Sequence, residues 1–415
     1  MELLGISNNN NNNSSSLSIA ALMMMLGIAT TSGSSSSGSG GGMTTVNLLD
    51  LAASAVASAV AAARPIRELS ERKNVRAKED GSAVTDADFA AQGIIVRALR
   101  QVEGDFRIVG EESPEEMEQH MRQETPDEYT ERQRIFRLAQ RELRYRYNGI
   151  DTDRMPLAQA EDEQEDEEEE EEAMGEPPTA AENERPDYIV DANRVSVFVD
   201  PLDGTKAYAK GEYDTVTTLI AIILDNQPYF GVITKPFGYK AQTSILDTGC
   251  VTIYGGNLLR AVFVAGGKAC PQPGSSSSSS SSSSLSGLPR AVISQSRSKG
   301  IVRDFVDHLA REGVVHSEPL FVSGAGEKSL RLVVGTEDET LWFFPKAGTS
   351  RWDVAASDAI LRAFGGRVTD KYGEDLDYST SRDDAENADG IIASNSASLH
   401  AECIRLFKEG NWHER

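Results

Sequence analysis

The chain has 415 residues, a hydrophobic content of 39% and a formal net charge of −24. These values are typical of a soluble globular protein that is long enough for two substantial cores. The run from Glu161 to Glu172 holds eleven acidic residues, and the net charge without it is still −13. This acidic balance argues against a nucleic-acid partner, because phosphate neutralisation needs clustered Lys and Arg. A small phosphorylated substrate gathered by metal ions remains compatible with it.

Cysteine usage and hydropathy bear on the compartment. The three cysteines, Cys250, Cys270 and Cys403, have no CxxC spacing, which indicates neither a disulfide framework nor a zinc site. A reducing compartment follows, so we expect a cytoplasmic protein. No apolar stretch approaches the roughly 20 residues of a membrane span, and we expect none. Organelle targeting is the alternative, because Leu17 to Ala29 has the length of a signal-peptide core, although it lacks preceding basic residues.

Several segments are too polar or repetitive to bury enough apolar surface to offset their ordering entropy. They are an Asn/Ser/Gly-rich start (1–42), an acidic insertion (153–186), a polyserine run (271–287) and a polar loop (379–389). We therefore expect an N-terminal α+β domain at 43–270, a linker at 271–287 and a C-terminal α/β domain at 288–415.

The first half of the chain begins with helical patterns. Pro65 is expected to break or kink the first helix. Thr85 and Asp88 have capping-box spacing at the start of the second, and Ser113 and Glu116 have it at the start of the third. The expected elements are helix 46–63, helix 85–102, strand 106–110, a helix from 113, and a charged helix at 132–147.

Strand patterns follow the acidic insertion and suggest an antiparallel-rich sheet. Its expected strands are 195–199, 217–224, 229–234, 242–246 and 258–264. Beyond the polyserine run, strands and helices alternate, which favours an α/β layer. The expected order is strand 291–294, helix 301–311, strand 320–322, helix 327–334, strand 340–344 and helix 351–364.

The most informative segment is the turn from Asp200 to Thr205, directly after the apolar run Val195 to Val199. Proline and glycine bracket a sharp turn, so the carboxylates of Asp200 and Asp203 can converge beside exposed backbone N–H groups. That arrangement suits a divalent metal beside a phosphate. The segment from Thr205 to Lys210 is expected to form a short helix whose N-terminus cradles a phosphate.

Three further carboxylates stand at strand ends or in first helical turns, namely Asp88, Glu111 and Asp353. Hard oxygen ligands of this kind suit Mg²⁺. Each also has a structural alternative. Asp353 can cap a helix, Asp88 is explained by its capping box, and Glu111 beside Glu112 can form a solvated acidic face.

Four blocks together resemble the lithium-sensitive, Mg²⁺-dependent phosphomonoesterase superfamily of inositol monophosphatases. They are Val84 to Asp88, Val109 to Ser113, Asp200 to Thr205, and Trp352-Asp353 with Gly365-Gly366. The resemblance implies an α/β (α+β) fold, a layered αβαβα sandwich, and agrees with the sheet followed by alternating elements.

Within that superfamily the chain is most similar to the 3′(2′),5′-bisphosphate nucleotidases. The match lies in Lys206 to Gly211, Gly231 to Phe237 and Gly324 to Lys328. Inositol polyphosphate 1-phosphatases share part of this pattern and also carry an insertion after the Glu-Glu-Ser block. Their turn usually has serine where Gly204 stands. Arg297 occupies a place where nucleotidases usually carry histidine; it can pair with a phosphate or be a surface arginine.

The resemblance implies a role for each matching residue. Two or three Mg²⁺ ions would be held by Glu111, Asp200, Asp203, Asp353 and the carbonyl of Leu202. Thr205, hydrogen-bonded to Asp88, would orient the attacking water and pass on its proton. The expected substrate contacts are Gly204, Thr205, Arg297, Gly324, Lys328 and Asp353.

The expected reaction is hydrolysis of adenosine 3′,5′-bisphosphate to AMP and phosphate, inhibited by Li⁺. Removal of the 1-phosphate from inositol polyphosphates such as inositol 1,4-bisphosphate is the alternative. An inert sensor of phosphorylated ligands is a third hypothesis, of a different class. Such a protein would be expected to lose a metal carboxylate or the Thr205 and Asp88 pair, and the sequence retains them all.

Overall fold

The structure is a computed structural model that describes residues 44–72, 74–78, 83–120, 122–149, 188–238, 249–265, 270, 287–334 and 338–414. All of these belong to one compact unit that spans residues 43–415. The segment 1–42, the acidic insertion, the polyserine run and the expected strand 242–246 lie outside the described residues. The proposed division into two domains stays a prediction.

Six strands form the first sheet, in the order β10-β9-β8-β7-β6-β4. Only β4 and β6 run parallel among these neighbours, and the other pairs are antiparallel. The antiparallel-rich sheet is therefore confirmed, although β9 was not predicted and β10 begins three residues later than expected. The strands are β4 (Arg107–Gly110), β6 (Val195–Asp203), β7 (Thr217–Leu224), β8 (Gln227–Lys235), β9 (Val251–Gly256) and β10 (Ala261–Val264).

Helices α2 (Leu48–Leu69) and α3 (Asp86–Leu99) pack against one face of this sheet, and α5 (Pro126–Tyr147) packs on α2. The short α4 (Pro114–His120) follows β4. Both predicted capping boxes are confirmed, at Thr85 with Asp88 and at Ser113 with Glu116.

Helix α2 differs from the prediction in two ways. It continues through Pro65 to Leu69, because the buried proline and the fully buried Ile66 remain packed in the core, which offsets one missing backbone hydrogen bond. It is also the one helix of the described part of the chain that is long and apolar enough to cross a membrane, contrary to expectation. Its most apolar window is 83% buried inside the protein, which identifies α2 as a core helix.

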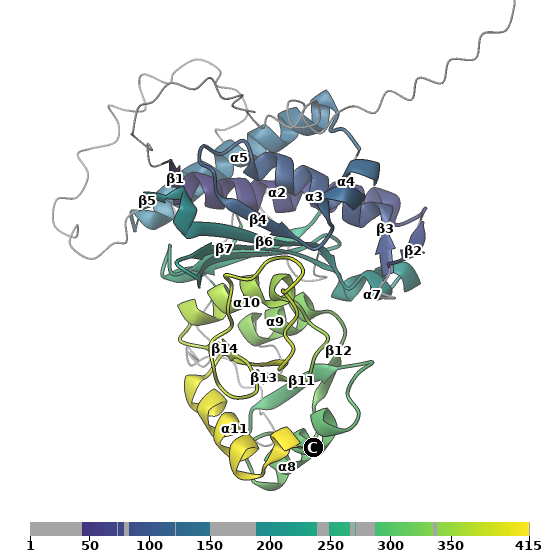
Figure 1. The fold of residues 1–415 in the computed structure, drawn as a ribbon, viewed down its shortest axis with the longest axis vertical. Coiled ribbons are helices and arrows are strands. Elements are labelled where there is room, and N and C mark those ends of the chain that lie inside the picture. The colour runs from purple at the N-terminus through teal and green to yellow at the C-terminus, as the bar shows by residue number, and fades with distance from the viewer. Residues whose placement is uncertain are drawn as a thin grey trace, which may run out of the picture. The chain divides into compact units, whose positions relative to one another are not determined.

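A second sheet of five strands has the order β12-β11-β13-β15-β14. Helices α9 and α10 contact both sheets, while α8 and α11 pack on the second. The layers are therefore helices, sheet, helices, sheet, helices, and the predicted αβαβα sandwich is confirmed (Figure 1). These elements are β11 (Arg290–Ser294), α8 (Ile301–Arg311), β12 (Leu320–Val322), α9 (Ala325–Val334), β13 (Glu339–Phe344), α10 (Arg351–Ala363), β14 (Arg367–Thr369), β15 (Ile391–Ser394) and α11 (Ala397–Glu409).

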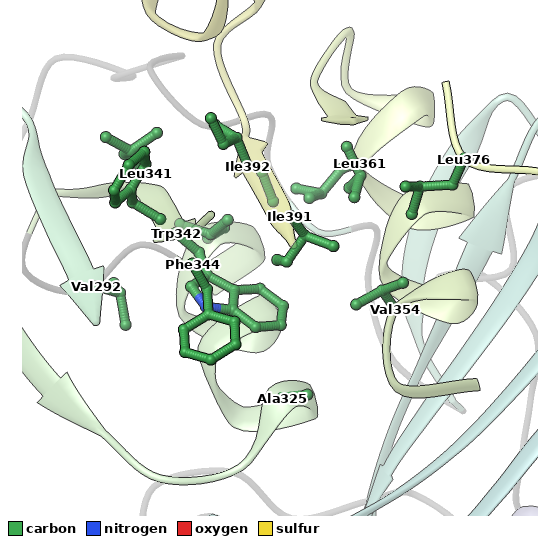
Figure 2. Close-up of a cluster of buried hydrophobic side chains, with 14 of the residues drawn as sticks. Val292, Ala325, Leu341, Trp342, Phe344, Val354, Leu361, Leu376, Ile391 and Ile392 are labelled. Carbon is green, nitrogen blue, oxygen red and sulfur yellow. The ribbon is translucent and has the colours of Figure 1, made fainter. Parts of the chain in front are cut away.

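The first sheet is buried on both faces, which explains its continuous apolar strands. Along β6, Val197 and Val199 belong to the core shared with α2 and α3, whereas Phe198 belongs to the core shared with α10 and the second sheet. Figure 2 shows this second core, in which Trp342 and Ile391 of the second sheet lie close to the apolar face of α10. Alternating side chains thus fix β6 from both sides and hold the residues at its end.

Two small antiparallel pairs complete the described fold, and neither was predicted. They are β1 (Thr45–Asn47) with β5 (Ile189–Asp191), and β2 (Val75–Ala77) with β3 (Ala83–Thr85). The second pair matters for function, because it places Lys78 and Thr85 at the same end of the molecule as the carboxylates of β6.

Candidate active site

Strand β6 does not stop before Asp200, as predicted, but continues through Asp203. Between Asp200 and Asp203 the pairing with β7 shifts register, so that three steps on β6 face two steps on β7, from Leu219 to Thr217. A bulge of this kind redirects side chains and is frequent beside functional sites. The bulge replaces the expected free turn and brings both aspartates to one side of the strand end.

The structure brings Asp200 and Asp203 together with Asp353. Each offers a carboxylate oxygen, and these oxygens all lie within 4.8 Å of one another. Asp353 comes from the first turn of α10, which packs on the first sheet. Residues at least 150 positions apart in the chain, Asp353 on one side and Asp200 and Asp203 on the other, therefore form one cluster, as the sequence predicted.

Hydrogen bonds orient each member of this cluster. Asp200 Oδ1 accepts the Leu202 N–H at 3.0 Å. Asp203 Oδ2 accepts both the Thr217 hydroxyl at 3.1 Å and the Gly326 N–H at 2.8 Å. Asp200 and Asp203 are buried. These hydrogen bonds therefore set the orientation of both carboxylates.

The sequence left open whether Asp353 caps a helix or belongs to the carboxylate cluster, and in the structure it does both. Its Oδ2 accepts the Ser350 N–H at 2.6 Å in a capping box, while the carboxylate also belongs to the cluster. A carboxyl group has two oxygens, so capping the helix with one fixes the direction of the other.

Burial and mutual repulsion raise the pKa values in the cluster. Burial is the largest cause for Asp200, whose pKa lies well above its usual range, followed by the charges of Glu111, Asp203 and Asp353. Burial and the charge of Asp203 raise the pKa of Asp353 to about 7. Such a cluster is electrostatically unfavourable by itself, and a bound cation would relieve it.

Glu111 lies beside the cluster and not within its set of mutually close oxygens. Its Oε1 accepts a hydrogen bond from Lys78 Nζ at 2.9 Å, and Lys78 also pairs with Glu112 at 2.7 Å. The Glu111 N–H donates to the Val199 carbonyl, which joins this segment to β6. The charge of Glu111 nevertheless contributes to the raised pKa values of Asp200 and Asp353.

The loop between β14 and β15, residues 370–390, holds Glu111 from the other side. The Arg382 guanidinium donates two hydrogen bonds to the Glu111 carbonyl, at 3.0 and 2.7 Å. Arg351, next to Asp353, donates to the Asp377 carbonyl of the same loop. The prediction that 379–389 is unstructured was therefore wrong, because arginine-to-carbonyl bonds fix it in place of an apolar core.

Thr205 and Asp88 form the predicted pair. The Thr205 Oγ1 lies 3.2 Å from Asp88 Oδ1 and 3.0 Å from the Leu202 carbonyl, so its single proton has two possible acceptors. Asp88 is fully buried, and its Oδ2 accepts the Thr85 N–H and hydroxyl. Burial and the charge of Glu111 raise the pKa of Asp88 to about 7. As with Asp353, the capping box and the proposed chemical role use different oxygens.

Gly204 precedes the predicted short helix, which is confirmed as α7 (Thr205–Lys210). Its φ of 85° lies in the left-handed region, which a residue with a side chain rarely adopts. This conformation turns the chain from β6 into α7 and places the Thr205 hydroxyl beside Leu202.

The predicted substrate-binding residues are arranged around the same end of the sheet. Lys328, in the first half of α9, donates from Nζ to the Gly324 carbonyl at 2.5 Å and lies 5.3 Å from the Trp342 ring. Burial lowers its pKa to about 8, against the opposing charges of Asp203 and Asp353. Arg297 donates to the Gly348 carbonyl at 2.6 Å and stacks on Phe344, with its guanidinium carbon 4.7 Å from the ring centre.

Three polar contacts of this site were not predicted. Lys78 and Arg382 stand in segments without a recognisable pattern, and only the fold brings them to Glu111. Thr217 was predicted as part of a strand. Threonine is common in strands because its side chain is β-branched, so its presence there did not indicate a bond to Asp203. The sequence carries no local signal for any of these contacts.

The carboxylate cluster fits a hard divalent cation. All the converging atoms are oxygens, which are the ligands that Mg²⁺ and Ca²⁺ prefer over softer metals. The pKa values of Asp200 and Asp353 are raised by burial and by the neighbouring carboxylates, and a bound cation would oppose both effects.

These pKa values predict the pH dependence of stability. Asp88 and Asp353 titrate near 7 in the folded protein but near 4 in the unfolded chain. Between those values the folded state holds protons that the unfolded state has lost, so unfolding becomes easier as pH rises through this window. Without metal, we expect the melting temperature of Asp353→Asn to fall less between pH 5 and pH 8 than that of the wild type.

The difference between the two proteins is the quantity to measure, by thermal denaturation in EDTA. Comparing the two proteins cancels the contribution of His400, which is the same in both. Burial lowers the pKa of His400 to about 4, so His400 favours the folded state more as pH rises toward 6.5. An identical pH slope in both proteins would contradict the assignment of the raised pKa to Asp353.

Comparisons with known proteins identify relatives. Inositol monophosphatase 3 of Danio rerio is 30% identical over 222 residues, which cover 52% of this chain and 55% of that protein. The human 3′(2′),5′-bisphosphate nucleotidase 1 is 33% identical over 184 residues, which cover 44% and 52%. A bacterial member of the inositol monophosphatase family from Bacteroides thetaiotaomicron, of solved structure, has 18% identity and a TM-score of 0.49, with coverage of 83% of this chain and 97% of that one. The chain thus spans about half the length of these curated relatives.

A family model provides the wider match. It describes the inositol monophosphatase family and aligns with residues 153–411, more than half of the chain. This range contains the whole carboxylate cluster and Thr205, while Asp88 and Glu111 lie before it. The chain therefore belongs to the inositol monophosphatase family, as its sequence blocks had indicated.

Proposed function

We propose that this protein is a Mg²⁺-dependent phosphomonoesterase that hydrolyses adenosine 3′,5′-bisphosphate to AMP and phosphate. The observation that carries the proposal is the convergence of Asp200, Asp203 and Asp353 within 4.8 Å, beside the hydrogen-bonded Thr205 and Asp88. The family is metal-dependent, generally on Mg²⁺. The family membership and the carboxylate cluster thus both support metal-dependent phosphate hydrolysis.

In this proposal the metal site is made by the carboxylates of Glu111, Asp200, Asp203 and Asp353 with the Leu202 carbonyl, and it takes two or three ions. Bound Mg²⁺ would lower the pKa of a water and neutralise charge on the leaving oxygen. The residues keep these oxygens directed before any ion arrives, through the bonds of Leu202 N–H to Asp200 and Gly326 N–H to Asp203.

Thr205 and Asp88 handle the proton. The Thr205 hydroxyl donates to Asp88 Oδ1, which leaves its oxygen lone pairs free to accept from the attacking water. As the water oxygen bonds to phosphorus, the bond from phosphorus to the ribose 3′-oxygen breaks. The water proton would pass to Thr205 and the hydroxyl proton to Asp88, and the leaving 3′-oxygen would take a proton from solvent to give the hydroxyl of AMP. A pKa of about 7 for Asp88 suits a group that accepts a proton near neutral pH.

The substrate groups would lie toward α9 and Phe344. Lys328 supplies positive charge near Asp203 and Asp353, Arg297 adds a second positive charge near Lys328, and the Gly324 turn lets the backbone approach closely. A bisphosphate has a second charged group for these cations, which a monophosphate lacks. This supports a bisphosphate in preference to a simple monoester.

Two observations favour a second candidate, removal of the 1-phosphate from inositol 1,4-bisphosphate. The Danio rerio relative, named inositol monophosphatase 3, is nearly as similar as the human nucleotidase, at 30% against 33% identity. Arg297 stands where nucleotidases usually carry histidine, and a guanidinium pairs with a phosphate without needing a base to stack on.

Phosphate release from the two bisphosphates decides between the candidates. We expect Mg²⁺-dependent release from adenosine 3′,5′-bisphosphate, inhibited by Li⁺, at a kcat/KM at least tenfold above that for inositol 1,4-bisphosphate, with 5′-AMP as a control that stays intact. Release from the inositol compound alone would overturn the nucleotide assignment. Turnover without Mg²⁺ would overturn the proposed mechanism.

A further inference from the structure

A buried ion pair joins the end of β8 to the start of α9. Lys235 Nζ donates to Glu327 Oε2 at 2.5 Å, and the two side chains are 3% and 2% exposed. Neither residue belongs to the carboxylate cluster or to the proposed substrate contacts. The pair is formed between residues 92 positions apart.

Each partner has further bonds that fix its position. Lys235 Nζ also donates to the Asp214 carbonyl, in the short 3-10 turn η4 (Tyr213–Thr215). The second oxygen of Glu327 accepts Arg331 Nε at 2.9 Å. Three segments, the end of β8, η4 and α9, are therefore held by one ammonium and one carboxylate.

These segments meet at the active site. A side chain at Gly324 would lie 2.6 Å from the Thr215 carbonyl and 2.9 Å from Asp203 Oδ2, and one at Gly204 would lie 3.2 Å from the same carbonyl. The Thr215 carbonyl thus separates the turn before α7 from the turn before α9. From the first turn of α9, the Gly326 N–H donates to Asp203 Oδ2 at 2.8 Å.

Stability alone does not explain this pair. Burying two charges costs solvation that their attraction only partly repays, and apolar replacements of both partners are often neutral or stabilising. A role in orienting the neighbouring segments explains the pair better. The Lys235 ammonium donates to η4 and to α9 at the same time, whereas an apolar side chain would fill the same space without orienting either segment.

We propose that Lys235 and Glu327 are positioning residues that hold the first turn of α9, with the Gly326 N–H and Lys328, against Asp203. The inference rests on the proposed function, because it assigns this turn to substrate binding. Through Lys235 the position of the turn also depends on η4, whose carbonyl limits how closely the turns of α7 and α9 approach.

The test separates stability from positioning with Lys235→Met, Glu327→Met and the double variant. Each single variant leaves a buried charge unpaired and should lower the melting temperature by on the order of 10 °C. The double variant should recover most of that loss. Its kcat/KM for adenosine 3′,5′-bisphosphate should nevertheless stay on the order of 10²-fold below wild type, mainly through KM, because the turn is misplaced.

Hydrogen exchange gives a readout that does not depend on activity. In the double variant, amides of residues 323–330 should exchange faster than in the wild type, while the strands of the first sheet keep their protection. The matched control is the exposed pair Arg303 and Asp307 on α8. Replacing both of these by methionine should change neither KM nor exchange at 323–330.

The outcomes are distinguishable. A stable double variant with wild-type KM and wild-type exchange at 323–330 would overturn the inference. Absence of turnover in the wild type with either bisphosphate would instead overturn the proposed function, and the exchange result would still decide the positioning role. If the double variant does not fold, Glu327→Gln keeps the side-chain shape and is judged by the same two measurements.

Discussion

Asp200→Asn is expected to lower Mg²⁺-dependent phosphate release by roughly 10³-fold or more, which corresponds to about 4 kcal/mol of lost transition-state stabilisation. Asp200 is buried at the centre of the cluster and interacts with Glu111, Asp203 and Asp353. The amide keeps the size of the side chain and can still accept the Leu202 N–H. The substitution therefore removes the charge and leaves the bulge in β6 intact.

The same substitution should raise the melting temperature of the metal-free protein. The carboxylates of the cluster repel one another in a buried place, and this is why the pKa of Asp200 is raised. Removing one charge relieves the repulsion, so lost activity accompanies gained stability, as at many active sites. The increase in melting temperature that Mg²⁺ gives to the wild type should be smaller in the variant.

Asp225→Asn is the matched control. Asp225 lies in the exposed turn between β7 and β8 and pairs with Arg194. The chemical change is identical, and asparagine tolerates its positive φ of 52°. We expect unchanged turnover. Full Mg²⁺-dependent activity in Asp200→Asn would refute the proposed metal site.

Thr205→Val should lower kcat by about 10²- to 10⁴-fold. Valine has nearly the shape of threonine but no hydroxyl, so the path from the attacking water to Asp88 is interrupted. The metal carboxylates are untouched, and we expect the melting temperature to rise with Mg²⁺ as in the wild type. Steady-state kinetics and thermal denaturation with and without Mg²⁺ measure the two effects.

Two further variants make this result specific. Thr205→Ser restores the hydroxyl and should restore most of kcat. Thr130→Val makes the same chemical change on the exposed side of α5, where the hydroxyl donates to the Pro126 carbonyl, and should leave kcat unchanged. A Thr205→Val enzyme with wild-type kcat would mean that water is activated without this hydroxyl.

Local sequence patterns predicted the parts of the site that local chemistry determines. Asp200 and Asp203 follow a strongly apolar strand, the capping box of Asp88 is readable over four residues, and Asp353 stands in a first helical turn. The sequence left their structural and chemical interpretations as alternatives. The structure shows why the structural and the chemical interpretation can hold together. In Asp88 one oxygen caps the helix and the other bonds to Thr205, and Asp353 caps α10 with Oδ2 while its carboxylate belongs to the cluster.

The remaining features depend on contacts between distant segments. The bulge in β6 requires β7 as a partner, and the pair of Lys235 with Glu327 needs the end of β8 to meet α9. The loop around Arg382 has the composition of a disordered segment, yet arginine-to-carbonyl bonds order it. The amino-acid composition of a segment indicates how much apolar surface it can bury. It does not indicate which of its backbone carbonyls will accept hydrogen bonds from distant arginines.

The bond from Arg382 to the Glu111 carbonyl has a consequence for biosynthesis. It joins residues 271 positions apart, and the cluster itself needs Asp353. During translation the strands of the first sheet, within residues 107–264, are made before those of the second sheet, within residues 290–394. A nascent chain therefore contains Asp200 and Asp203 long before Asp353 completes the cluster, and we expect the proposed phosphatase activity to begin only after residues 353–382 have left the ribosome.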